Sequence, residues 1–358
     1  IIKQPFTQTL GTSNYRAGVN AGNSIASGGN NNTVVGDEAG TALTTGDDNV
    51  AIGFEALKTE DAHGRNVAVG YQSLKTLNAG VVAVTTTVGY KSGTSLTTGV
   101  QNVLIGGLSG DALTDADFNV AVGNNTLTTD TQGSKSTAVG YEALTAQNFT
   151  SATDSHNTAV GHQAGAAVTT GTENTLIGSL SGDALTTGVR NTAVGKSSLS
   201  ANTTGDFNTA VGRTALENVT TADGNTAVGV AAGSQITEGA NNTAMGYLAL
   251  NLNTTGARNN AIGVTALDAN TTASENNAFG FGALGSNTTG SENVAIGQDC
   301  LTLNTTASGN TASGTGSLKT NTTGATNTAF GKFSLRQNTT GTSNTAVGYQ
   351  AGLIATTG

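Results

Sequence analysis

The sequence predicts an all-β protein, a parallel β-solenoid (β-roll) of about 20 coils with a 17-residue repeat. Two observations carry this prediction. A glycine returns along the whole chain inside a motif such as Asn-Thr-Ala-Val-Gly, and from Gly161 to Gly348 the step is 17 residues without exception. The segments between these glycines are short runs of alternating Thr, Ala and Val, bounded by Asn, Gly and Thr-Thr pairs. A fixed period of this kind marks a repeat architecture.

The composition of each repeat favours strands over helices. Alternating Thr-Ala-Val segments flanked by Gly and Asn are typical of short strands and tight turns. A glycine inside a helix costs about 1 kcal/mol relative to alanine, and this chain has 51 glycines among 358 residues. Seventeen residues are enough for short strands and turns but too few for a unit that contains a helix. Stacked coils would place identical residues roughly 4.8 Å apart.

Asparagine holds one corner of nearly every repeat. With the recurring glycine numbered zero, position −4 is Asn in eighteen of twenty repeats, and Thr85 and Ser136 are the exceptions. An Asn at the same corner of stacked coils is expected to form a ladder of side-chain amide hydrogen bonds. The ladder is predicted to include Asn49, Asn66, Asn191, Asn208, Asn225, Asn242 and Asn344.

The interior is predicted from an exchange between positions +4 and +7. Position +4 is always Leu or Gly. Gly233 is followed by an apolar +7 residue, Ile236, whereas Leu267 is followed by Asn270. One bulky aliphatic side chain per coil would therefore fill a common space, which is volume conservation in a packed interior. We expect these side chains to point inward, together with the Val or Ile of position −1, for example Val211.

The repeat also predicts where the chain departs from regularity. The step lengthens by two residues between Gly70 and Gly89 and by four between Gly140 and Gly161. Because loops tolerate insertions, we expect both to bulge from a continuous stack. We expect residues 1–13 to be a leader or connector, and residues 14–358 to be one solenoid rod, a segment of a longer fibre protein.

Composition argues against several classes of function. Charged residues are 10% of the chain and its net charge is −9, so we expect no nucleic-acid partner. No apolar run reaches 18 residues, which argues against membrane insertion. His63, His156 and His162 are scattered, and Cys300 occupies a position that is always small, which indicates packing. We therefore predict a protein that is not an enzyme and has no cofactor or metal ion.

Three stretches carry a resemblance to known fibres. Residues 208–216, 242–256 and 344–352 resemble the repeats of bacteriophage tail-fibre and related surface-fibre proteins. The core Asn-x-Ala-Val/Ile-Gly-x-x-Ala/Ser is also similar to the head repeat of YadA-like trimeric autotransporter adhesins, although the period here is longer. That resemblance implies a left-handed parallel β-roll trimer on a virion surface or on the cell surface.

A thin core points to self-association on independent grounds. Each coil supplies about one Val or Ile and one Leu, whose burial is worth roughly 3–6 kcal/mol. Ordering the backbone costs about 1–2 kcal/mol per residue, so a second buried surface would help. A homotrimer, in which three chains share one axis, would supply that surface.

Three functions compete at this point. We predict a structural fibre shaft, most plausibly of a phage tail fibre or similar virion appendage. The first alternative is a bacterial cell-surface adhesin head that binds glycan or matrix, with a host surface glycan or receptor as its partner, through the variable positions +1 and +2. Its candidate ligand-binding residues are Tyr71, Tyr90, Tyr141, Tyr247 and Tyr349. A minor alternative is an ice-binding solenoid, which would use the Thr-Thr pairs at positions +8 and +9.

Overall fold

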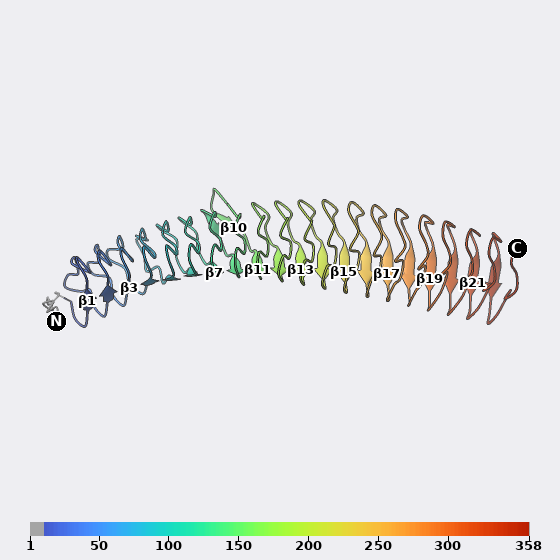
Figure 1. Cartoon of the computed structure of the whole chain (residues 1–358), viewed down its shortest axis with the longest axis horizontal. Helices are drawn as coiled ribbons and strands as arrows, with labels where there is room; N and C mark the ends of the chain where they lie inside the picture. Colours follow the sequence, from blue (N-terminus) through green and yellow to red (C-terminus); the bar gives the residue numbers. More distant parts are fainter. Residues whose placement is uncertain (1–10, 358) are drawn as a thin grey trace. The chain divides into compact units, whose positions relative to one another are not determined.

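The computed structural model describes residues 11–357, and all regular structure in this range is β. The fold is the predicted parallel β-solenoid, with about 20 turns and a repeat of about 17 residues (Figure 1). By its internal contacts the chain divides into two compact units, which meet at residues 179 and 180. We call residues 11–179 the N-terminal unit and residues 180–357 the C-terminal unit. The proposed leader falls mostly on residues 1–10, which lie outside the described range.

The N-terminal unit stacks one short strand per turn. Each strand pairs in parallel with the strand of the next turn, for example Val50 with Val67. The strands of the stack are β1 (Tyr15–Ala17), β2 (Thr33–Val35), β3 (Val50–Ile52), β4 (Val67–Val69), β5 (Thr86–Val88), β6 (Val103–Ile105), β7 (Val120–Val122), β9 (Thr137–Val139), β11 (Thr158–Val160) and β12 (Thr175–Ile177). A small second sheet joins β8 (Gly133–Ser134) to β10 (Thr153–Asp154).

The C-terminal unit is more regular. Its ten strands, β13 to β22, pair in parallel and in sequence order, so that Thr209 lies opposite Thr226 and Ala210 opposite Ala227. The strands are β13 (Thr192–Val194), β14 (Thr209–Val211), β15 (Thr226–Val228), β16 (Thr243–Met245), β17 (Asn260–Ile262), β18 (Asn277–Phe279), β19 (Val294–Ile296), β20 (Thr311–Ser313), β21 (Thr328–Phe330) and β22 (Thr345–Val347).

The recurring glycine ends each strand for two physical reasons. Gly212 has φ +134°, a backbone conformation that residues with a side chain rarely adopt. A Cβ at this position would also lie 2.4 Å from the carbonyl oxygen of Gly229 in the next turn. The turns can therefore stack closely only where this corner has no side chain.

The strand pattern corrects one part of the predicted core. We expected position −1 to point inward, but Val69 and Val211 are only half-buried, and Ala68 and Ala210 before them are fully buried. Successive side chains of a strand point to opposite faces. Because Asn at −4 is inside, Ala at −2 shares its face and the larger residue at −1 points outward. The prediction was wrong because it placed the larger apolar side chain inside.

The exchange between positions +4 and +7 occurs in the interior as predicted. Leu267 and Asn270 are both fully buried, and so is Ile236. A Cβ on Gly233 would lie 2.9 Å from the Cδ1 atom of Ile236, so the glycine leaves the space that the isoleucine occupies. The two kinds of turn therefore fill the same volume from different backbone positions.

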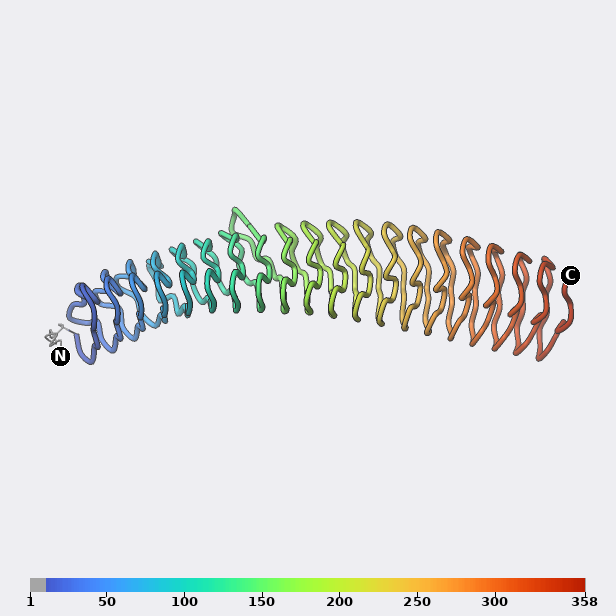
Figure 2. Tube along the Cα trace, viewed as in Figure 1, coloured from blue at the N-terminus to red at the C-terminus, as the bar shows by residue number. Residues whose placement is uncertain are grey.

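The stack continues past both insertions. Strand β4 pairs directly with β5, and β9 pairs directly with β11. The first insertion exposes Val81, Val82 and Val84 in a loop. The second carries β10, and the chain around it projects beyond the neighbouring turns (Figure 2). Extra residues are thus accommodated outside the main ladder, as expected of loops.

Candidate functional site

The predicted Asn ladder runs inside the solenoid, but its bonds differ from simple amide pairing. The backbone N–H of Asn208 donates to Oδ1 of Asn191 at 2.9 Å. The Nδ2 of Asn208 donates to the carbonyl oxygen of Ala222, at position +10 of the same turn, at 2.8 Å. Direct amide pairing also occurs, as from Asn344 Nδ2 to Asn327 Oδ1 at 3.0 Å. Asn208 therefore links its turn to the neighbouring one and also closes its own turn.

Other ladder residues repeat the bond between turns, although Nδ2 of Asn66 and Nδ2 of Asn225 have no hydrogen-bond partner. Asn66 N–H donates to Asn49 Oδ1 at 3.0 Å, and Asn242 N–H donates to Asn225 Oδ1 at 2.9 Å. All are buried. They stabilise the stack and leave no donor group directed at solvent, so their role is structural.

A second buried ladder, at position +7 of the C-terminal unit, was not foreseen. Asn270 Nδ2 donates to Asn253 Oδ1 at 2.8 Å and to the carbonyl of Ala273 at 3.0 Å. The same pairing links each member to the next one along the unit: Asn253, Asn270, Asn287, Asn304, Asn321 and Asn338. The recurrence of Asn after Leu was the available signal, which we had interpreted only as a volume effect.

The outward side chains of position −1 form one continuous apolar row in each unit, which we call the outer strand face. In the N-terminal unit it consists of Val35, Ile52, Val69, Val88, Ile105, Val122, Val139, Val160 and Ile177. In the C-terminal unit it consists of Val194, Val211, Val228, Met245, Ile262, Phe279, Ile296, Phe330 and Val347, with Ser313 the one polar member. All are partly or well exposed. Extended apolar surface of this kind is typical of interaction sites.

The proposed aromatic strip is brought together only in part. Phe54, Tyr71 and Tyr90 stack on successive turns, with ring centroids 5.4 Å and 5.5 Å apart. Tyr141 stacks instead on His162 at 5.4 Å. Because stacked rings cover one another's faces, these residues present mainly ring edges to a ligand.

The remaining two candidates lie in the C-terminal unit. Tyr247 and Tyr349 are well exposed and occupy turns six repeats apart. Within the C-terminal unit these two tyrosines are therefore not neighbours.

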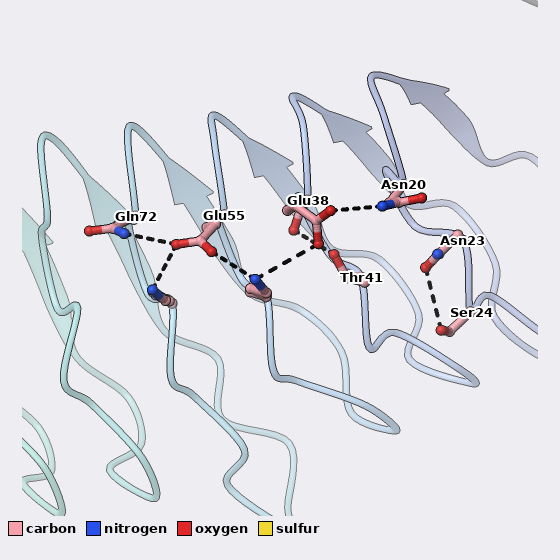
Figure 3. A network of polar contacts seen from close by, with 9 residues as sticks. Asn20, Asn23, Ser24, Glu38, Thr41, Glu55 and Gln72 are labelled. Atoms are coloured by element: carbon pink, nitrogen blue, oxygen red, sulfur yellow. Dashed lines mark hydrogen bonds and ion pairs between the residues drawn. The ribbon is translucent and has the colours of Figure 1, made fainter.

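A charged network lies beside the aromatic stack, at position +2 of the first turns. Figure 3 shows Asn20, Glu38, Glu55 and Gln72 following one edge of successive turns. Glu55 Oε1 accepts a hydrogen bond from Lys58 Nζ at 2.7 Å. Glu55 Oε2 accepts one from Gln72 Nε2 at 2.8 Å and lies 2.7 Å from Lys75 Nζ. The lysines and Gln72 lower the pKa of Glu55 to about 2.

The threonine pairs do not present two free hydroxyls per turn. At position +8, Thr254 Oγ1 donates to the carbonyl of Thr271 at 3.1 Å, and the same bond recurs from Thr271 to Thr288. The solenoid itself uses these hydroxyl donors, so only the exposed threonine at +9 faces water. This weighs against the ice-binding alternative.

The single cysteine is sealed in the interior. Cys300 is fully buried, its thiol donates to the carbonyl of Ala312 at 3.3 Å, and burial raises its pKa to about 12. A thiol with so high a pKa carries no nucleophilic thiolate at neutral pH.

Comparison with known proteins adds no assignment. The sequence matches no protein-family model and no curated protein. Within residues 11–357, no helix is long and apolar enough to cross a membrane. The candidate site with the most extensive support is therefore the outer strand face.

Proposed function

We propose that the chain is a structural shaft segment of a surface fibre, most plausibly a phage tail fibre or a similar virion appendage, which gives reach and rigidity for host attachment. One observation carries the proposal: the outer strand face repeats an apolar side chain on almost every turn of both units. An apolar surface that recurs once per turn of the solenoid suits a partner whose own surface recurs with the same period.

A second copy of the same chain satisfies that requirement. The period is the same in every copy, so equivalent turns of associated chains would meet at equivalent positions along their whole length. Each turn offers only a narrow surface, namely the side chains of positions −3 and −1, for example Asn277 and Phe279. Three narrow faces that converge on one axis would bury this surface, and we therefore propose a homotrimer.

The trimer is tested by measuring its mass with a matched pair of variants. Phe279 belongs to the outer strand face and is 38% exposed, whereas Phe281 lies two residues further along, at position +1, and is 56% exposed. We expect light scattering of the purified chain to give three times the chain mass. Phe279→Asp should lower this mass or weaken the assembly, because it places a charge in the interface.

Phe281→Asp is the control, because it makes the same chemical change outside the proposed interface. We expect it to keep the trimer mass. A wild-type chain that stays monomeric, or a control that dissociates as readily as Phe279→Asp, would contradict the proposal. Turnover of a substrate by the purified chain would overturn the structural function itself.

The adhesin alternative is weaker but can be tested on the same protein. Tyr247 keeps an exposed ring, whereas Tyr71 and Tyr90 stack on each other. A glycan screen of the purified chain, repeated with Tyr247→Ala, separates the two functions. Binding that Tyr247→Ala abolishes would favour an adhesin, and no binding along the shaft agrees with a structural role.

A further inference from the structure

The third turn of the N-terminal unit carries a buried acidic residue at position +7, which most other turns fill with an aliphatic residue or asparagine and which is acidic elsewhere only at Asp130. Glu60 occupies position +7, and its side chain is fully buried. One of its carboxylate oxygens, Oε2, has no hydrogen-bond partner, and neither does the buried Nδ1 atom of His63 three residues later. Leaving buried polar atoms unpaired costs about 1–3 kcal/mol each, so two at one place require an explanation.

The geometry around these atoms converges. Glu60 Oε1 accepts a hydrogen bond from the backbone N–H of His63 at 3.1 Å and lies 3.4 Å from Nδ1 of its ring. Asp61 adds a second carboxylate, and one ligand atom from each of the three residues lies within 4.8 Å of the others. Within residues 11–357 this is the one such group of three acidic or histidine side chains.

The neighbouring turns hold the loop in place. Thr44 donates to the carbonyl oxygen of Asp61 from its N–H at 2.6 Å and from its hydroxyl at 2.9 Å. The carbonyl oxygen of His63 accepts from Asn49 Nδ2 of the inner ladder at 3.2 Å. The backbone of this loop is therefore fixed on the solenoid before any ligand arrives, which lowers the cost of binding.

The separation of one pair of donor atoms, Glu60 Oε1 and His63 Nδ1, matches a small metal ion. Zinc binds nitrogen and oxygen ligands at about 2.0–2.2 Å in a tetrahedral arrangement, which places neighbouring ligand atoms roughly 3.3 Å apart. The distance between Glu60 Oε1 and His63 Nδ1 is 3.4 Å. A mixed set of imidazole and carboxylate suits Zn²⁺, whereas Mg²⁺ and Ca²⁺ prefer oxygen ligands alone.

We propose that Glu60, Asp61 and His63 bind a divalent transition-metal ion, Zn²⁺ being the best match, with a fourth position open to water. The ion would pair the unpartnered ring nitrogen and compensate the buried carboxylate. It would also close the loop between two turns, which is a structural role independent of the fibre assembly.

Zinc titration of the whole chain tests the site. We expect calorimetry with ZnCl2, after removal of metals by a chelator, to give one ion per chain. Glu60→Asn should lower the affinity by at least about 10–100-fold, since even outer-sphere partners contribute that much. Asparagine already fills position +7 in other turns, for example at Asn270, so this variant is compatible with the fold.

Two further variants keep the test decisive. His63→Gln should lower the affinity to a similar extent without changing the interior position, and His162→Gln, a histidine outside the cluster, should leave it unchanged. The visible absorption of Co²⁺ in place of Zn²⁺ should show a four-coordinate site in the wild type and lose this signature in His63→Gln. Absence of stoichiometric binding by the wild type, or equal affinity in Glu60→Asn and His63→Gln, would overturn the proposal.

Discussion

The two units have the same turn but differ at its interior position +7. In the C-terminal unit, from Asn253 onward, every turn to Asn338 places an Asn there, and these amides form one continuous buried ladder. In the N-terminal unit the same position holds six different residue types. Its occupants are Ile25, Leu43, Glu60, Leu77, Leu96, Leu113, Asp130, Gln147 and Val168.

This difference at position +7 shows that a side-chain ladder forms only where the same residue recurs on every turn. A side-chain ladder needs the same residue on neighbouring turns, because each amide supplies a partner for the next. Where the residue changes, buried polar groups must be satisfied locally. Asp130, for example, accepts from the N–H groups of Gly133 and Phe149 at 3.0 Å each, and from Gln147 Nε2 at 2.6 Å.

The two units also differ in the side-chain clusters that they carry. The N-terminal unit carries the stacked aromatic residues, the Glu55 ion network and the proposed metal site. The turns after Asn253 instead repeat one interior solution. We infer that the regular turns supply stability, whereas the irregular turns tolerate individual side chains with special contacts.

The strongest test of the common turn is Gly212→Ala. The substitution forces a side chain into a conformation with φ +134° and places Cβ 2.4 Å from the carbonyl oxygen of Gly229. We expect a loss of about 4–5 kcal/mol or more in the free energy of unfolding, the range of severe backbone and packing defects. Denaturant unfolding followed by circular dichroism measures the loss.

Gly348→Ala is its matched control. Gly348 has a similar φ of +125°, but a Cβ there would meet nothing within 4 Å. It should therefore suffer only backbone strain, about 1–3 kcal/mol. Equal losses in the two variants would show that conformation alone, without close stacking, explains the glycine.

The next largest effect is expected in the interior of the regular unit. Leu267 is fully buried, and Leu267→Ala should cost about 2–5 kcal/mol, the range for a buried leucine. The double change Leu267→Gly with Asn270→Leu recreates the alternative turn and should recover part of this loss. Thermal melts of both variants test the exchange, and no recovery would make the pattern coincidental.

The structure explains why that recovery should be incomplete. Asn270 links Asn253 to Asn287 in the second ladder, at 2.8 Å and 2.9 Å. Leucine at position 270 fills the volume but removes both amide contacts.

Most of the fold was predictable because residues that recur at fixed positions of the repeat indicate which positions form turns, ladders and the interior. Glycine and asparagine at fixed positions predicted the turns and the first ladder, and the exchange at Leu267 and Asn270 predicted a shared interior volume. The direction of Val211 was not predictable from hydrophobicity, since its inward neighbour Ala210 is the smaller apolar residue. Only the strand register decides which of two adjacent residues faces the core.

The candidate sites were less predictable, because they depend on contacts between turns. The sequence identifies the aromatic residues. Only the stacking of successive turns in the structure shows that the rings of Tyr71 and Tyr90 cover each other's faces. In the sequence, His63 is only one of three scattered histidines. The available signal is the acidic Glu60 at position +7, which most other turns fill with an aliphatic residue or Asn, but sequence spacing alone does not bring the two side chains together.

A smaller effect is expected from one amide of the second ladder. Asn304 Nδ2 donates to Asn287 Oδ1 at 2.9 Å and to the carbonyl of Ala307 at 3.0 Å. Asn304→Ala should therefore cost about 1–3 kcal/mol, the penalty for buried groups that lose their partners. Hydrogen exchange should show the loss confined to the adjacent turns, since each turn contacts only its neighbours. A loss spread evenly over the unit would contradict this local view.

The smallest effect concerns the charged network of the N-terminal unit, and it depends on pH. Lys58, Lys75 and Gln72 lower the pKa of Glu55 from 4.5 to about 2, so the folded state favours the ionised carboxylate. The resulting stability is fully present above about pH 4.5 and is lost as the pH falls toward about 2. Glu55→Gln removes the charge but keeps the shape of the side chain.

We therefore expect Glu55→Gln to be less stable than the wild type by about 1 kcal/mol or less at neutral pH, as is usual for a network of surface ion pairs. The difference in urea midpoint between the two proteins should shrink as the pH is lowered below 4.5. Glu275→Gln is the control in the other unit, because its pair with Arg258 is exposed and should contribute little at any salt concentration. A gap between wild type and Glu55→Gln that persists unchanged to pH 2 would show that Glu55 acts through its contacts and not through its charge.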